Sequence, residues 1–196
     1  MASSKTNLII YGYLRKMIKE KSLANAESFV SICSPVSDDV IAQLRVGDRI
    51  SISGKIFTGR DAALPKIVEL LQSDKLPVYG INLQGSVIFH TAVSDAGVGP
   101  TSSNKAEIVR CIPALAKAGV RIHLGKGALP QDTIKALADC NSVYAVIPPV
   151  TALLESKTTG KRVVAFEELG MEAMFELEVN GYPAIIAAAH GETIYK

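Results

Sequence analysis

Three cations in this sequence stand where an expected strand gives way to an expected helix. Residues 99–105 read Gly-Pro-Thr-Ser-Ser-Asn-Lys, so hydroxyl groups, small residues and Lys105 gather just before a helix. A helix start offers unpaired backbone N–H groups and the positive end of the helix dipole, which suit a small carboxylate. Arg60 follows the expected strand 49–58, and Lys126 lies between two glycines after the expected strand 121–124. Together the three cations predict a site for a small dianion.

Each of these motifs also has an ordinary structural explanation, which stays open at this point. Ser, Thr and Asn are the preferred helix caps, so residues 101–104 can be a capped helix start and no more. Arg60 can pair with a neighbour at the surface, although its guanidinium is the side chain best shaped to hold a carboxylate by two hydrogen bonds. The Gly-Lys-Gly run at 125–127 can be a turn with an exposed lysine. It is not a nucleotide-binding loop, because Gly127 stands where Ser or Thr would bind magnesium.

Composition narrows the class of protein. The chain has 196 residues, of which 48% are hydrophobic and 6% aromatic, and its 21 basic and 19 acidic residues give a net charge of +2. These charges are well mixed, so we expect no nucleic-acid partner. The apolar run at 8–14 is too short to cross a membrane and has no cleavage site, so we expect neither a membrane helix nor a signal peptide. Three widely spaced cysteines suit a reduced, cytoplasmic protein.

The order of expected elements indicates an α/β fold with a mostly parallel sheet, because strands and helices alternate over residues 85–150. Period-two or continuously apolar patterns predict strands at 29–33, 49–58, 87–90, 121–124, 143–147 and 163–166, and two closing strands that flank Gly191. Helical patterns cover residues 7–21, 37–44, 61–72 (with Asp61 as its cap), 104–117, 131–139 and 168–179. The strand-rich ends of the chain favour more than one layer of sheet. We divide the chain into an N-terminal helix and strand extension at 1–34 and a main domain at 35–196.

Histidines and cysteines carry little signal of their own. His90, His123 and His190 have no metal-ligand spacing, so each is expected to be structural or at the surface. Three thiolates would be enough for an iron–sulfur cluster with one open iron, but no pattern groups the three cysteines. We therefore expect no metal site on this chain.

Taken together, the motifs resemble the β subunit, or C-terminal half, of class I fumarases and L(+)-tartrate dehydratases. The resemblance covers about three quarters of the chain and rests on the order and spacing of its motifs. These are Val-Gly-Asp at 46–48, residues 53–63, Gly-Pro-Thr-Ser-Ser at 99–103, Gly-Lys-Gly at 125–127, Glu-Leu-Gly-Met-Glu-Ala at 168–173 and Gly-Tyr-Pro-Ala at 181–184.

This resemblance implies a swivelling β/β/α three-layer domain and a hydro-lyase that reversibly adds water to a C4 dicarboxylate, such as fumarate/malate or tartrate/oxaloacetate. A [4Fe–4S] cluster would sit on a partner α subunit, where its open iron acts as a Lewis acid, and the chain would be active only in that hetero-oligomer. Thr101 would be the base, or otherwise a hydrogen-bond donor to the substrate. A base role needs nearby positive charge, because a free threonine hydroxyl is a very weak acid. The expected substrate-binding residues are Arg60, Thr101, Ser102, Ser103, Asn104, Lys105 and Lys126.

The chain departs from the family pattern at two places. Lys105 stands where an arginine is usual, and a lysine cannot make the bidentate fork. His90 is not followed by the usual Gly-Pro turn. The substrate is therefore left open. Two other functions remain alternatives: a non-catalytic carboxylate-binding or regulatory domain that keeps the fold, and a stand-alone metal enzyme that uses its own cysteines.

Overall fold

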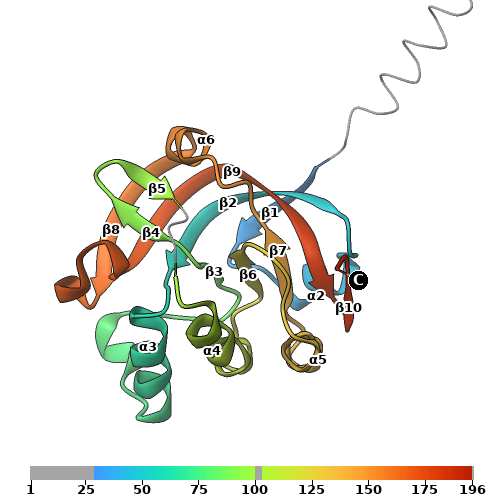
Figure 1. Cartoon of the computed structure of the whole chain (residues 1–196), viewed down its shortest axis with the longest axis horizontal. Helices are drawn as coiled ribbons and strands as arrows, with labels where there is room; N and C mark the ends of the chain where they lie inside the picture. Colours follow the sequence, from blue (N-terminus) through green and yellow to red (C-terminus); the bar gives the residue numbers. More distant parts are fainter. Residues whose placement is uncertain (1–28, 100–102, 196) are drawn as a thin grey trace, which may run out of the picture.

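The computed structural model describes residues 29–99 and 103–195, and its centre is a curved sheet that closes on itself (Figure 1). Five strands share one direction along the parallel pairings β1–β2–β3–β6–β7. The antiparallel strand β9 then pairs with both β7 and β2 and so completes a ring of β2, β3, β6, β7 and β9. The strands are β1 (Val30–Ser34), β2 (Arg49–Thr58), β3 (Val87–Phe89), β6 (Ile122–Gly125), β7 (Val143–Val146), β8 (Thr158–Ala165), β9 (Met174–Ala189) and β10 (Glu192–Thr193).

The α/β class and the shared direction of the central strands are confirmed. The expected β/β/α three-layer arrangement is not what the structure has, because five strands of the main sheet close into a barrel. The reason is the length of β9, whose sixteen residues reach along β2, β7, β8 and β10. A strand this long can pair on both sides and join the two edges of the sheet. Local sequence patterns give no signal for such a closure.

Helices cover the outer side of the parallel strands. Figure 1 shows α3, α4 and α5 side by side along this face, and α3 and α5 each contact α4. β4 and β5 form a separate hairpin, which packs against α6. The remaining elements are α2 (Asp38–Gln43), α3 (Ala63–Gln72), η1 (Leu76–Tyr79), β4 (Ala92–Ser94), β5 (Gly97–Gly99), α4 (Lys105–Lys117), α5 (Gln131–Asp139), α6 (Thr151–Ser156) and η2 (Glu167–Glu172).

Both faces of the parallel strands are buried, which explains their continuous apolar runs. On β6, Ile122 and Leu124 point into the ring, and His123 between them points toward the helices. The same alternation places Ile88 and Tyr144 on the helix side, in register with His123 on its two neighbours. One apolar core therefore fills the ring and a second lies beneath α3, α4 and α5.

Two local predictions were wrong. Residues 168–179 were expected to form a helix, but a short 3-10 helix ends at Glu172 and β9 begins at Met174. Gly170 has φ 57° and ψ −121°, which no helix accommodates, and pairing with β2 and β8 then fixes the extended chain. Asp61 does not cap α3, whose first residue follows Ala62 without a side-chain cap. The predicted helix at 7–21 lies outside the described residues.

Candidate active site

The candidate site lies where the carboxyl ends of neighbouring parallel strands meet. β2 ends before Arg60, β3 ends before His90 and β6 ends before Lys126, and these strands are adjacent in the sheet. Ligands of α/β sheets bind at this edge because loops from several strands converge there. α4 begins at the same edge, since the backbone N–H of Asn104, just before this helix, donates to Asp61 in the β2–α3 loop.

Arg60 is buried and holds two carboxylates. Its Nε donates to Asp61 Oδ1 at 3.1 Å, and its Nη2 lies 3.1 Å from Glu172 Oε1, while only 5% of its side chain is exposed. Asp61 Oδ2 in turn accepts the backbone N–H of Asn104 at 3.0 Å, at the start of α4. Burial raises the pKa of Asp61, but the hydrogen bonds from Asn104 and Arg60 outweigh it and hold that pKa below its usual value. Asp61 therefore stays ionised and ties Arg60 to the helix start.

Lys105 bridges two elements of the site. Its side chain leaves the first turn of α4, and its Nζ donates to the carbonyl of Ala128 in the β6–α5 loop. Two reasons favour glycine at position 127. A Cβ there would lie only 3.0 Å from this Nζ, and the backbone has φ +72°, which residues with a side chain rarely adopt. The ammonium of Lys105 thus fixes the loop that carries Lys126.

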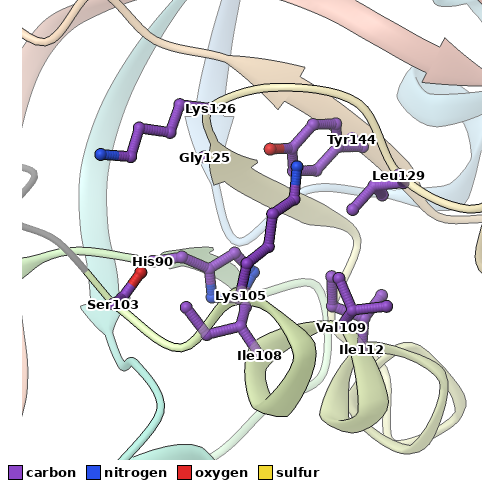
Figure 2. Close-up of a pocket in the computed structure, with 10 residues that line it drawn as sticks. All are labelled: His90, Ser103, Lys105, Ile108, Val109, Ile112, Gly125, Lys126, Leu129 and Tyr144. Atoms are coloured by element: carbon purple, nitrogen blue, oxygen red, sulfur yellow. The ribbon is translucent and has the colours of Figure 1, made fainter.

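A cavity of about 300 Å³ opens between α4 and the ends of β3, β6 and β7 (Figure 2). Three of the predicted substrate-binding residues line it: Ser103, Lys105 and Lys126. Its other lining residues are His90, Ile108, Val109, Ile112, Gly125, Leu129 and Tyr144. Asn104 is exposed and is not part of this lining, and neither is Arg60. Thr101 and Ser102 lie outside the described residues.

Two histidines form a hydrogen-bonded pair beneath the cavity. His90 Nδ1 lies 3.1 Å from the Gly59 carbonyl and His90 Nε2 lies 3.2 Å from His123 Nδ1. Because a carbonyl only accepts, Nδ1 of a neutral His90 carries the proton and its Nε2 accepts from His123. Burial lowers the pKa of His90 to about 4, against the opposing effect of the Gly59 carbonyl, and lowers that of His123 well below its usual value. The pair is therefore neutral at pH 7.

Sequence reasoning gave these histidines no joint role. The signal that could have found them is their position, since His90 directly follows β3 and His123 lies in the next strand of the sheet. Both ring nitrogens of His90 are occupied, so His90 holds the Gly59 turn in place and does not exchange protons with a ligand. His123 is fully buried, and its Nε2 has no hydrogen-bond partner among the described residues.

Tyr144 is a third residue of the site whose role sequence reasoning missed. It is 3% exposed, its ring borders the cavity, and burial raises the pKa of its hydroxyl. A Cβ added to Gly125 would lie 2.6 Å from the Tyr144 hydroxyl oxygen, far inside van der Waals contact. Gly125 is thus required by the close approach of this ring.

We expect Gly125→Ala to destabilise the fold by about 1–3 kcal/mol, the usual cost of overpacking. Removing the hydroxyl in a Gly125→Ala/Tyr144→Phe double variant should recover part of this loss. Urea unfolding of the wild type, both single variants and the double variant measures the coupling between the two positions. Strictly additive effects would contradict the proposed steric contact.

No group of three His, Cys, Asp or Glu side chains within residues 29–99 and 103–195 is arranged to hold a metal ion. Cys33 is exposed on β1, Cys111 is buried in α4 and Cys140 follows α5. Burial raises the pKa of the Cys111 thiol to about 11, which disfavours the thiolate that a metal needs. These residues do not fit an iron–sulfur cluster. Among the described helices, none has the length and apolar character to cross a membrane.

The parallel strands of the barrel end at a cavity bordered by Lys105 and Lys126, and the fold is of the α/β class. The sequence pattern of the family described as "Fumarase C-terminus" matches residues 12–196, so the chain belongs to this family.

Two relatives of similar length are tartrate dehydratase subunits by name. A protein of Methanocaldococcus jannaschii named "Putative L(+)-tartrate dehydratase subunit beta" is 34% identical, over 80% of this chain and 86% of its own length. The L(+)-tartrate dehydratase subunit beta of Escherichia coli is 26% identical, over 83% of this chain and 85% of its own. The anaerobic class I fumarate hydratase of Escherichia coli is 30% identical over 76% of this chain, which spans only 29% of that longer protein.

Proposed function

We propose that this chain is the β subunit of an iron–sulfur-dependent hydro-lyase that reversibly adds water to a C4 dicarboxylate, fumarate/malate or tartrate/oxaloacetate. The family match and the names of the relatives of similar length support this assignment. The observation that carries it is the convergence of three predicted cations at one edge of the sheet: Arg60 and Lys126 come from the loops after β2 and β6, and Lys105 comes from the first turn of α4.

The cations give this chain its part in the chemistry. Abstraction of a proton beside a carboxylate builds negative charge on that carboxylate, and fixed cations stabilise this charge as it forms. On the strength of the family resemblance, we assign the substrate's carboxylates to Lys126, which borders the cavity, and to Arg60, which is linked through Asp61 to the start of α4. Ser103 borders the same cavity and can donate a hydrogen bond. Thr101, with Ser102 beside it, stays the proposed base on the strength of the family resemblance.

We assign the iron–sulfur cluster to an α subunit that would be the partner of this chain. The described residues of this chain do not fit a cluster, and the two relatives of similar length carry "subunit beta" in their names. We further propose that the hetero-oligomer is cytoplasmic, that the domain swivels against its partner, and that residues 35–196 form the catalytic unit behind an extension at 1–34.

The test is to purify the chain with and without its α partner and to assay hydration and dehydration of C4 dicarboxylates without oxygen. We expect activity only in the complex. Full activity of the chain alone would refute the two-subunit proposal. Thr101→Ala should abolish turnover and leave assembly intact, whereas Thr159→Ala, exposed on β8, serves as the matched control. Near-normal turnover of Thr101→Ala would remove the base role.

One observation favours a second candidate, a carboxylate-binding or regulatory domain without turnover. Lys105 donates one hydrogen bond to the Ala128 carbonyl, so that donor is used within the protein and not for a substrate. A complex that contains an intact cluster and binds dicarboxylates, but hydrates none of them, would support this alternative.

A further inference from the structure

A groove of about 420 Å³ lies on the outer face of the barrel. Its floor is a row of three side chains on neighbouring strands, because Ile185 of β9 is in register with Arg49 of β2 on one side and with Val146 of β7 on the other. Directly paired residues of neighbouring strands point to the same face of a sheet. Ala184 and Ile186, which flank Ile185, belong to the core inside the ring, so the row points outward.

The groove is apolar, and no residue of a described helix lines it. Its lining residues are Phe29, Arg49, Val146, Ile147, Pro148, Pro183, Ala184 and Ile185, of which only Arg49 is charged. None of these residues lines the cavity of the candidate active site. Helices α3, α4 and α5 cover the outer side of the parallel strands (Figure 1), so within residues 29–99 and 103–195 this part of the barrel lacks the second layer that an apolar sheet face normally has.

Large apolar side chains are exposed at this groove. The exposed fraction is 47% for Phe29 and 38% for Ile185, and it is 43% for Val30, which directly follows Phe29. Single exposed apolar residues are ordinary, whereas a contiguous group of them marks a surface that another element covers. The groove is therefore a docking surface.

The chain itself brings a segment to the edge of this groove. Phe29 lines the groove and is the first residue that the structure describes, so the segment 1–28 joins the barrel at this point. Residues 22–28 can extend over about 23 Å, about twice the diameter of a helix with its side chains. A segment attached in this way has an effective concentration in the millimolar range, which favours it over a separate chain.

The sequence of this segment has the pattern of an amphipathic helix over residues 7–21. Its apolar residues gather on one side of the predicted helix, at spacings of one and two turns: Ile10, Leu14, Met17 and Ile18. Lys16 and Lys19 fall on the opposite side. A helix of this length is marginal on its own in water, so it needs an apolar surface against which to bury its apolar side.

We propose that residues 7–21 form a helix that lies across the groove, with its apolar side against Val146 and Ile185 and its lysines toward water. This helix completes the outer layer of the barrel at the place that α3, α4 and α5 leave uncovered. The occupant of the groove is thus a segment of the same chain. The groove lies outside the candidate active site, so its occupancy does not depend on the hydro-lyase assignment.

The chain has no tryptophan, so a single indole introduced into the groove reports whether the groove is covered. We compare quenching of this indole by acrylamide, a neutral quencher, in full-length Ile185→Trp and in the same variant with Leu14→Asp/Ile18→Asp. The two carboxylates cannot pack against the apolar groove without losing their hydration. We expect the quenching constant to rise about twofold, because the helix then no longer shields the indole from solvent. Equal quenching constants in the two proteins would overturn the proposal.

Two matched controls isolate the contact between the segment and the groove. Val163→Trp places the indole on β8, where the native side chain has the same 38% exposure as Ile185, and Leu14→Asp/Ile18→Asp should leave its quenching unchanged. Lys16→Asp/Lys19→Asp puts two carboxylates on the opposite side of the predicted helix and should leave the quenching of Ile185→Trp unchanged. An equal rise in quenching with the lysine pair and with the apolar pair would contradict packing through the apolar side.

Other occupants of the groove give different results in the same measurement. We expect the quenching of full-length Ile185→Trp to be independent of protein concentration, because the occupant belongs to the same chain. Quenching that rises on dilution, together with a dimer in sedimentation that dissociates over the same range, would assign the groove to a second copy and overturn the proposal. Shielding of the indole that begins only when an α subunit is added would overturn it as well.

Discussion

An Arg60→Leu variant is expected to lose hydro-lyase turnover by at least about a hundredfold, the typical cost of one preorganised charge-stabilising group. It is also expected to lose about 1–3 kcal/mol in free energy of unfolding, because Asp61 and Glu172 would keep their charges without this partner. The stability loss stays below that of a deeply buried pair, since 22% of the Asp61 side chain and 27% of the Glu172 side chain are exposed. Urea unfolding and steady-state kinetics of the complex measure the two effects separately.

Paired variants separate the structural role of Arg60 from its role toward the substrate. Neutralising one partner in Arg60→Leu/Glu172→Gln should recover part of the stability and none of the turnover. Arg162→Leu is the matched control, because Arg162 also binds a carboxylate, Glu176, but is 62% exposed, where an ion pair contributes little. If the double variant regained turnover together with stability, Arg60 would be only a structural residue.

The central part of the fold could be predicted from the sequence because each strand carries a local signal. The predicted strand at 49–58 coincides with β2, and the apolar runs at 87–90, 121–124 and 143–147 overlap with β3, β6 and β7. These runs are apolar throughout because they are covered on both sides, by the ring interior and by α3, α4 and α5. The helices that cover them have a strong 3.6-residue period for the same reason.

The closure of the ring could not be predicted in this way. It depends on β9 pairing with β2 over residues 176–185, more than a hundred positions apart in the chain. Residues 168–173 contain good helix formers, so local propensity pointed to a helix through 179. The tertiary pairing of Met174 and the residues after it overrode that propensity.

In the candidate site, too, some features have a local sequence signal and others depend on tertiary contacts. Strand-to-helix junctions are visible in the sequence, so the convergence of Arg60, Lys105 and Lys126 at one edge of the sheet could be anticipated. The hydrogen-bond partners of these residues could not be anticipated, because they depend on how the elements pack against one another. Lys105 reaches Ala128 across the cavity, and Asp61 serves the start of α4 instead of its own helix. The predicted roles of Thr101 and Ser102 stay predictions.

Acid is expected to destabilise the protein through the His90–His123 pair. Burial lowers the pKa of His90 to about 4 and that of His123 well below its usual value, whereas both rings take up protons near pH 6.5 in the unfolded chain. Between these values the unfolded state binds more protons than the folded state. The stability is therefore fully present above pH 6.5 and falls as the pH drops, by about 2 kcal/mol for one such histidine between pH 7 and pH 4.5.

The hydrogen bonds show why a proton on this pair is unfavourable in the folded state. A protonated His90 carries a hydrogen on both nitrogens, so His123 Nδ1 must accept, and the proton of His123 then moves to its buried Nε2, which has no partner among the described residues. The hydrogen bond from His90 to the Gly59 carbonyl stays in place and favours the protonated ring, so the cost of protonation is this unpaired donor beneath the cavity. Urea unfolding from pH 4.5 to pH 7.5 should show a weaker pH dependence in His90→Gln than in the wild type. Equal pH dependence in the wild type and His90→Gln would show that the pair does not titrate as its burial requires.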